Sequence, residues 1–567
     1  MTLNFPNNTR RELHSGAEHS IYDMKFRRKF SVNPYKSLQM KLGEMSFFKD
    51  WLNTSRGDPY PVIHRDGEGT LTETTGDGRF TVRNFSRKSA AEARLLGQHF
   101  PYATYELVLK NLDSASAGFR ISVSAGDRSA YTEENAPSLR VSLVRVPGRN
   151  AVRIAHELTV GGVSRGTVTE EREYPYVSGM SMILTCRGRF FDVYLRDDKR
   201  PYPRLTLDLP EFSEVIRYGT FAGTSAALWY EVSPNGCFTA DEVQFYLDGG
   251  VSHADMKTVR YEDGMPMMSE GKLFMTMSSR LEAGGFQSVI SWNPSTAEFK
   301  MEGAIFFDCG DDRWCSDVAS SILFNRYTNE WYIWACSFSH GHILCHGTSI
   351  ADLRYGINVI DAELMPAEIL ESADTSGDSL AAQAGASASA TAKLSDDTLW
   401  FGKSGDEDPD FVYDRETGKW YMTICRGVRE ADGTHYRYFL YESDEPFSGY
   451  RYVDRTLTGS NTGGSIVRVG GKLQFVCGSN FDKRACYHVY DLHDLSKVDY
   501  IRCDYDDGGF RGWGTVIPVP CGNRTKYMWM TFDRHGGSSY NWSYGNIYVY
   551  ESDLMNYGYE GGIQYNL

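Results

Sequence analysis

Apolar and polar residues alternate along most of the chain between about residues 65 and 250. Segments such as RFTVRNF, TYELVLKNL and GFRISVSA repeat this alternation with period two, and turn residues separate them. The pattern is typical of β-strands that bury one face, and the short connections favour antiparallel pairing. We therefore predict that residues 61–250 form a β-sandwich of two packed sheets.

The strands of this segment, together with the GRFFDVYL hairpin, resemble a concanavalin-like lectin jelly roll in outline. The resemblance leaves the role of the domain open, since it could bind glycan, complete the rim of a pocket or drive oligomerisation. Residues 1–60 are polar and mixed, and we expect an N-terminal arm or a lead-in strand there.

A different pattern begins at about residue 255, where one design recurs five times. Each copy has an apolar strand, a turn containing Gly or Asn, and a strand rich in aromatic residues or methionine. The copies are GMPMMSEGKLFMTMSS from 264, SSILFNRYTNEWYIWACS from 320, PDFVYDRETGKWYMTICR from 409, GSIVRVGGKLQFVCGS from 464 and TVIPVPCGNRTKYMWMTF from 515. Five such units closing on themselves predict a five-bladed β-propeller over residues 255–567. The Ala/Ser/Asp-rich segment 371–398 is expected to be an insertion between the second and third blades.

Composition and charge exclude several classes of function. The formal net charge is −15 without a Lys/Arg-rich stripe, so we expect no nucleic-acid partner, because phosphate binding needs clustered cations. No run approaches 18 apolar residues, and the first residues lack the apolar segment of a signal peptide. We therefore expect no membrane span and a cytoplasmic location.

The 11 cysteines contain no CxxC pair and are expected to be free, mostly buried thiols.

The repeat register brings acidic residues together. The first strand of each propeller blade lines the central axis, and counting six residues back from each turn aligns Asp263 of blade one with Asp408 of blade three. Two residues earlier in the register, blade two offers Asp317. Carboxylates brought together spread their pKa values, which supplies one base and one acid. The alternative is that these acids only bind backbone amides of neighbouring blades.

The segments EDGMPMMSEGKLFMT, WCSDV and DPDFVYDRETGKWYM resemble motifs of the five-bladed propeller glycoside hydrolases, the superfamily of families 43, 32, 62, 68 and 117. The resemblance implies that Asp263 is the general base or nucleophile and that Asp317 tunes the proton donor. The donor of those families is usually a glutamate in blade three or four, whereas blade four here reads SNTGGSIV, without an acid. Glu407 and Asp408 both stay open as donors, because neighbouring strand residues point to opposite faces. A histidine donor, His342 or His535, is a third alternative.

The sequence thus predicts an exo-acting glycoside hydrolase that removes a terminal sugar, of arabinofuranose or fructofuranose type by the resemblance, from an oligosaccharide. Retention or inversion depends on the separation of the two carboxylates. Further substrate contacts are expected from residues that begin or end the inner strands: Trp314, Asn461, Thr462, Arg511, Trp513, Asp533, His535 and His342.

The alternatives are a phosphorylase or transglycosylase, with Arg313, Arg511 and His535 as a phosphate seat, and a non-catalytic carbohydrate-binding protein. No cofactor and no metal ligand set is expected, although the resemblance allows a structural calcium ion on the axis. The His-rich segment HGHILCH is not expected to bind a metal. A homo-oligomer is left open.

Overall fold

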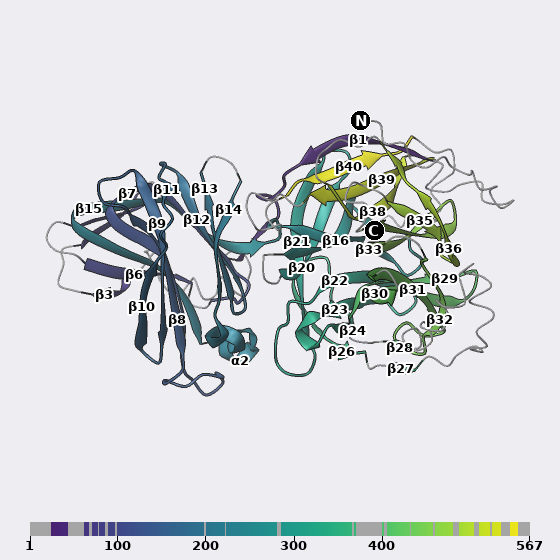
Figure 1. The fold of residues 1–567 in the computed structure, drawn as a ribbon, viewed down its shortest axis with the longest axis horizontal. Coiled ribbons are helices and arrows are strands. Elements are labelled where there is room, and N and C mark those ends of the chain that lie inside the picture. The colour runs from purple at the N-terminus through teal and green to yellow at the C-terminus, as the bar shows by residue number, and fades with distance from the viewer. Residues whose placement is uncertain are drawn as a thin grey trace.

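The structure is a computed structural model of the 567-residue chain, in which two domains lie side by side (Figure 1). It describes residues 24–42, 62–66, 71–76, 79–84, 89–96, 99–197, 200–221, 223–280, 285–365, 368–369, 400–401, 405–430, 433–457, 460–479, 487–503, 510–521, 524–533 and 545–553. Strands dominate these residues, which confirms the all-β prediction. Among them, no helix is long and apolar enough to cross a membrane.

The N-terminal domain is one hydrogen-bonded network of strands built around two long neighbours. Its strands are β2 (Gln39–Lys41), β3 (Val62–Asp66), β4 (Leu71–Gly76), β5 (Arg79–Asn84), β6 (Ser89–Leu96), β7 (Thr104–Val123), β8 (Pro137–Arg145), β9 (Ala151–Val160), β10 (Val163–Thr169), β11 (Tyr174–Pro175), β12 (Met180–Arg187), β13 (Phe190–Arg196), β14 (Tyr202–Asp208) and β15 (Thr224–Asp248). The antiparallel pair β7 and β15 runs from Thr224 opposite Val123 to Tyr246 opposite Thr104. A 3-10 helix, η3 (Pro210–Ile216), and α2 (Tyr218–Phe221) connect β14 to β15. The jelly-roll topology stays a prediction.

Five separate sheets form the blades of the C-terminal domain. Blade one contains β16 (His253–Thr258), β19 (Lys272–Arg280), β20 (Gly285–Asn293), β21 (Glu298–Asp308) and β25 (Gly356–Asp361), with β18 (Met268–Ser269) at its side. Blade two contains β17 (Arg260–Tyr261), β22 (Val318–Asn325), β23 (Glu330–Ser337), β24 (Ile343–Ser349) and β26 (Glu363–Leu364), and the 3-10 helix η4 (Phe338–His340) follows β23. Blade three contains β29 (Asp406–Asp414), β30 (Lys419–Glu430), β31 (Gly433–Ser443) and β32 (Arg451–Arg455). Blade four contains β33 (Asn461–Val469), β34 (Lys472–Ser479), β35 (His488–Asp491) and β36 (Asp494–Tyr500).

Blade five takes its outer strand from the other end of the chain. It contains β38 (Phe510–Cys521), β39 (Arg524–Asp533), β40 (Ile547–Glu551), β1 (Lys25–Val32) and β37 (Arg502–Cys503). β1 pairs antiparallel with β40, and Figure 1 shows the purple first strand beside the yellow last one. The N-terminal arm therefore contributes to the propeller, while β2 pairs with β15 of the other domain.

The inner strands close into a ring, since β16, β22, β29, β33 and β38 contact one another in this order and β38 contacts β16. The five-bladed propeller is thus confirmed. β27 (Glu368–Ile369) and β28 (Trp400–Phe401) form a separate two-stranded ladder between blades two and three. The predicted insertion 371–398 lies outside the described residues.

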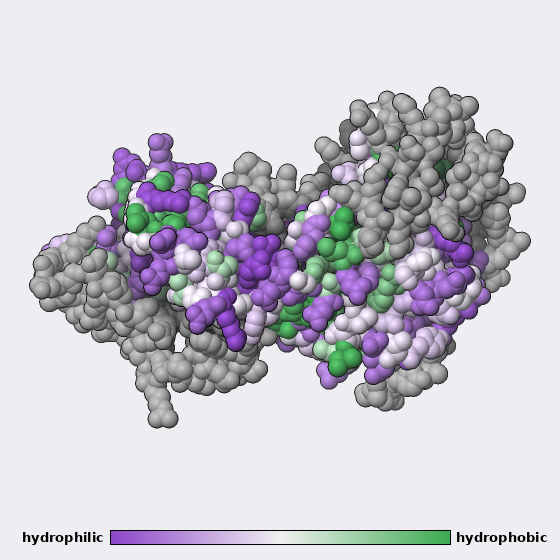
Figure 2. All heavy atoms as spheres, turned by 90° about the horizontal axis from the view of Figure 1, so that it is seen from below, coloured by the Kyte–Doolittle hydropathy of each residue, from purple (hydrophilic) through white to green (hydrophobic). Residues whose placement is uncertain are grey.

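The two domains share one continuous apolar core. Phe100 and Tyr102, just before β7, pack on Phe306 of β21, and the Tyr102 and Phe306 ring centroids lie 4.6 Å apart. Outside this core, hydrophilic side chains gather where the domains meet on the face seen from below (Figure 2). The domain junction therefore has an apolar centre and a hydrophilic edge.

Candidate active site

Each inner strand carries a β-bulge close to its start. The pairing register shifts between Ala254 and Lys257 in β16, Val318 and Ser321 in β22, Glu407 and Asp410 in β29, Thr462 and Ser465 in β33, and Arg511 and Thr515 in β38. The first bulged residue has a left-handed backbone in four blades: φ is 53° at Asp255, 57° at Ala319, 51° at Asp408 and 62° at Gly463. A bulge bends its strand and redirects side chains, so these positions are structural equivalents around the axis.

The bulges correct the predicted register of blade one, because the residue equivalent to Asp408 is Asp255 and not Asp263. In blades two and three a short turn joins the inner strand to the next, whereas residues 259–271 intervene in blade one. Within them, β17 leaves its own sheet and pairs parallel with β22 of blade two. Counting back from the blade-one turn therefore started from the wrong strand.

Asp263 lies near the opposite end of the axis from the other acids. Its Oδ2 is 2.6 Å from Arg326 and 3.3 Å from Arg415, which follow the ends of β22 and β29. The same two arginines pair with Glu262, which is fully buried. Asp263 thus belongs to an ion-pair network that ties three blades together.

The first of the three acids at the start of β29 is structural. Asp406 is fully buried, and its two carboxylate oxygens accept hydrogen bonds of 2.6 and 3.0 Å from Arg426 on the neighbouring β30. The two opposite charges neutralise each other inside blade three. Because both carboxylate oxygens of Asp406 accept hydrogen bonds from Arg426, we assign Asp406 a structural role.

The next two acids have contrasting environments. Glu407 is about a quarter exposed, and its Oε1 lies 2.9 Å from His342 Nε2, without the alignment of a hydrogen bond. Asp408 is buried, and its Oδ2 accepts from the Tyr438 hydroxyl at 3.2 Å and from the Gly463 N–H at 3.1 Å. Burial, followed by the charges of Asp255 and Glu407, raises the pKa of Asp408 to about 7.

Asp317, just before β22, is held by the segment that follows β23. Its Oδ2 accepts from the Ser337 hydroxyl at 2.7 Å, and its Oδ1 accepts from the Ser339 N–H at 3.1 Å. Burial raises the pKa of this carboxyl, although these hydrogen bonds and the nearby His340 oppose the shift. The bulk of the carboxylate is enclosed, with 1% of the residue exposed.

The buried thiol of Cys336 marks the place where the acids meet. Its pKa is raised well above the usual range by burial and then by the charges of four carboxylates: Glu407, Asp408, Asp317 and Asp255. Blades one, two and three therefore carry Asp255, Asp317, Glu407 and Asp408 at the same end of their inner strands, and the catalytic roles of these residues stay a prediction.

Below the acids, side chains fill the axis. Lys257 is buried, and its ammonium donates to the carbonyl oxygens of Ala319 at 3.3 Å and Pro409 at 2.7 Å. One layer further, the buried Arg260 guanidinium pairs with Asp410. The Lys257 ammonium and the Arg260 guanidinium already occupy the axis, and Lys257 donates to its carbonyl oxygens. These residues therefore do not fit the calcium ion that the resemblance allows there.

The remaining predicted residues that the structure describes lie at the acid end of the inner strands or at the domain junction. Asn461 is buried at the same end as the acids and contacts His488 Nδ1 at 3.0 Å, with Thr462 beside it. The backbone of Arg511 pairs with Phe532, and that of Asp533 with Phe510, so both strand ends reach the level of the acids. Trp513 falls within the bulge of β38, and His535 lies outside the described residues.

Trp314 lies at the domain junction. Its ring stacks on Tyr218 of α2 with centroids 5.4 Å apart, and its backbone N–H and C=O bind Ile216 and Tyr102. The neighbours of this ring are therefore protein side chains of the other domain.

Two exposed aromatic rings near the acids were missed in the sequence. Tyr436 of β31 is 38% exposed, and its pKa is raised by burial and by the charge of Glu407. Phe338 is 43% exposed and packs on His342 with centroids 4.4 Å apart. Their sequence signal is weak, because Tyr and Phe occur throughout the propeller strands.

No family model and no curated protein matches this sequence. Several solved glycoside hydrolases match the structure. They include a family 43 β-1,3-galactosidase with galactodeoxynojirimycin (TM-score 0.35, 13% identity, 52% of this chain and 93% of that chain). An inulosucrase from Halalkalicoccus jeotgali bound to kestose has a TM-score of 0.35 and 12% identity over 55% of this chain and 89% of that chain. The α-L-arabinofuranosidase PaAbf62A from Podospora anserina, in complex with cellotriose, has a TM-score of 0.33 and 9% identity over 54% and 92%. We therefore argue function from the site's own residues.

Proposed function

We propose that the protein is a glycoside hydrolase in which Asp255 acts as the base or nucleophile and Glu407 donates the proton. The observation that carries this proposal is the convergence of carboxylates from three blades on one end of the axis, in environments that differ. Glycoside cleavage needs one ionised and one protonated carboxyl group. The role predicted for Asp263 passes to Asp255, which occupies the bulge position of blade one.

The position of Asp255 supports it as the base or nucleophile. It occupies in blade one the bulge position that Asp408 occupies in blade three. Burial and the charge of Asp255 raise the pKa of Asp408 to about 7, and the Tyr438 hydroxyl and Gly463 N–H keep Asp408 in place.

Accessibility supports Glu407 as the proton donor. Of the carboxyl groups near Cys336, Glu407 has the larger exposed fraction, 26% of its side chain, whereas Asp317 and Asp408 are buried. A donor must reach the leaving oxygen of the sugar. His342 Nε2 lies 2.9 Å from Glu407 Oε1, so the two side chains are neighbours at the mouth of the site.

The filled axis favours attack on chain ends. Because Lys257 and the Arg260–Asp410 pair occupy the axis below the acids, a substrate enters from one side only, which suits an exo-acting enzyme and a terminal sugar. By the resemblance to propeller relatives, we propose a furanoside of arabinofuranose or fructofuranose type.

The free and mostly buried thiols among the described residues favour a cytoplasmic site of action on oligosaccharides.

A phosphorylase is the second candidate, but its phosphate seat loses support. Arg313 donates to Glu214 at 2.6 Å and lies near Asp311 at the domain junction, so its charge is engaged there. The test of both functions is sugar release from p-nitrophenyl furanosides, pyranosides and oligosaccharides, with and without phosphate. Turnover only with phosphate would replace hydrolysis by phosphorolysis, and binding without turnover would make the protein a carbohydrate-binding one.

Three variants test the residue roles. Asp255→Asn should lower kcat by about 10²- to 10⁴-fold on every substrate, as expected for loss of a base. Glu407→Gln should lose as much on oligosaccharides but less on p-nitrophenyl glycosides, whose leaving group needs no proton. Asp263→Asn is the matched control, and should keep kcat within about threefold because its carboxylate lies in a structural network. Full activity in Asp255→Asn would refute the assignment.

A further inference from the structure

A group of potential metal ligands lies beside the acids, at the junction of the two domains. Asp311 and Cys315, in the loop between β21 and β22, approach His340 at the end of η4, and one ligand atom from each lies within 4.8 Å of the others. Asp311 Oδ2 is 3.7 Å from His340 Nε2. Atoms around one tetrahedral ion with bonds of about 2.0–2.3 Å lie roughly 3.3–3.7 Å apart, so small side-chain movements would complete the site.

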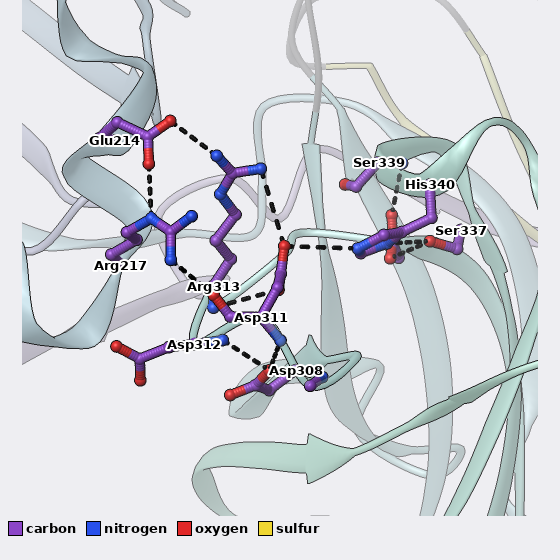
Figure 3. Close-up of polar contacts among 11 residues, drawn as sticks. Glu214, Arg217, Asp308, Asp311, Asp312, Arg313, Ser337, Ser339 and His340 are labelled. Carbon is purple, nitrogen blue, oxygen red and sulfur yellow. Dashed lines mark hydrogen bonds and ion pairs between the residues drawn. The ribbon is translucent and has the colours of Figure 1, made fainter. Parts of the chain in front are cut away.

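The imidazole of His340 is oriented for this role. Its Nδ1 contacts the Ser337 hydroxyl at 2.9 Å, which leaves Nε2 directed toward Asp311. A hydrogen bond at one ring nitrogen commonly fixes the other nitrogen as a metal ligand. In Figure 3 the His340 ring points from its own loop toward Asp311 across the gap between the two segments.

The loop of Asp311 is also held in place. Asp308 Oδ1 accepts hydrogen bonds from the backbone N–H groups of Gly310, Asp311 and Asp312. From the other domain, Arg217 donates to the Asp311 carbonyl at 2.8 Å. The carboxylate therefore sits on a loop that both domains fix, as shown by the contacts in Figure 3.

Cys315 supplies a buried sulfur, and its backbone exchanges hydrogen bonds of 3.0 and 2.8 Å with Phe307 of β21. A thiol that binds a zinc-class ion gives up its proton. Asp311 and His340 are partly exposed, at 33% and 19% of their side chains, so an ion can reach them.

We propose that Asp311, Cys315 and His340 form a binding site for a divalent transition-metal ion of the zinc class. The mixed oxygen, sulfur and nitrogen donors suit zinc or cobalt rather than calcium or magnesium, which take oxygen ligands. Because the Ser337 hydroxyl contacts both His340 Nδ1 and Asp317 Oδ2, the ion would be linked to Asp317 through two side chains, His340 and Ser337. The proposal itself does not depend on the proposed hydrolase activity.

One neighbouring residue, Arg313, should weaken the binding of a cation, so its substitution tests the direction of the change in metal affinity. Arg313 NH1 lies 3.7 Å from Asp311 Oδ2, although its other terminal nitrogen is held by Glu214 at 2.6 Å. A guanidinium so close repels a divalent cation. Arg313→Gln should therefore raise metal affinity by roughly threefold or more, whereas a purely structural ion-pair network would show no such gain.

The experiment is titration of the full-length, EDTA-treated protein with Co²⁺, followed by competition with Zn²⁺. We expect one equivalent to bind with a thiolate-to-cobalt charge-transfer band. Cys315→Ser should abolish the band, and Asp311→Asn and His340→Gln should each weaken binding at least about tenfold. Cys521→Ser, which changes an exposed cysteine elsewhere, is the matched control and should leave band and affinity unchanged.

Three outcomes would overturn the proposal: no charge-transfer band in the wild type, a band that persists in Cys315→Ser, or equal affinity in wild type, Asp311→Asn and His340→Gln. Should Cys315→Ser fail to fold, the variants at the two partly exposed ligands still decide the question. Thermal unfolding of each metal-free variant verifies that its fold is intact.

Discussion

Two buried aspartates that are two residues apart on β29 should respond in opposite ways to loss of their charge. Asp406 is paired with Arg426, and Asp408 faces other carboxylates. Both are nearly inaccessible, at 0% and 4% exposure. Asparagine has the same shape as aspartate, so Asp406→Asn and Asp408→Asn compare charge in two neighbouring environments of one strand.

The expected change in the free energy of unfolding for Asp408→Asn follows from the pKa of Asp408. A rise from 3.8 to about 7 corresponds to at most about 4 kcal/mol, at 1.36 kcal/mol per pKa unit. Because the folded state binds the proton more tightly than the unfolded state, this carboxyl costs nothing below about pH 4 and reduces stability progressively up to about pH 7. Asp408→Asn should therefore be neutral near pH 4.5 and stabilising at pH 8. The amide nitrogen needs an acceptor of its own, which makes 4 kcal/mol an upper limit.

Asp406→Asn should destabilise instead, since the buried Arg426 guanidinium would lose the carboxylate charge that it pairs with. Removing one partner of a buried ion pair costs about 3–5 kcal/mol. The assay is thermal unfolding of wild type and both variants at pH 4.5 and pH 8, with near-UV circular dichroism as the tertiary probe. If Asp408→Asn lowers the melting temperature at pH 8, or changes it equally at both pH values, the charge cluster at the axis is wrongly described.

Two further predictions concern parts of the fold outside the acid cluster. Trp314→Ala should lower stability by about 2 kcal/mol, because the ring packs on Tyr218, and should leave KM within about twofold; a raised KM at unchanged melting temperature would instead indicate contact with sugar. Phe26→Ala should cost about 3–5 kcal/mol, because this fully buried ring of β1 contacts Trp529 of blade five; an unchanged melting temperature would show that β1 is dispensable for closing the ring.

The blade count could be predicted from the sequence because the repeated hairpins are local. Blades two, three and four each join their two inner strands by a turn that sequence identifies, as at residues 415–418. Closure by β1 could not be predicted in the same way. Its partner β40 lies more than 500 residues further along the chain, and no local pattern specifies a pairing over that distance.

The site could be predicted only where the repeat was regular. The repeat register placed Asp317, Glu407 and Asp408 near the starts of inner strands, where the structure has them, but it passed over Asp255 because β17 crosses to the next blade before blade one continues. A signal did exist: Asp255 and Lys257 in HADMKT have the spacing of Asp408 and Asp410 in DPDF. Charged residues two apart at the start of a short strand mark the same bulge in both blades.

The bulge also explains why the choice between Glu407 and Asp408 could not be made from strand alternation. Adjacent residues of a regular strand point to opposite faces, yet the charges of both carboxylates act on the same thiol of Cys336. The left-handed backbone at Asp408, with φ at 51°, interrupts the alternation and allows both side chains to reach the axis. Ala319 and Gly463 hold the same left-handed conformation at this position in blades two and four, so the conformation belongs to the bulge that the blades share. Strand alternation therefore fails at this position wherever the bulge recurs, whatever residue occupies it.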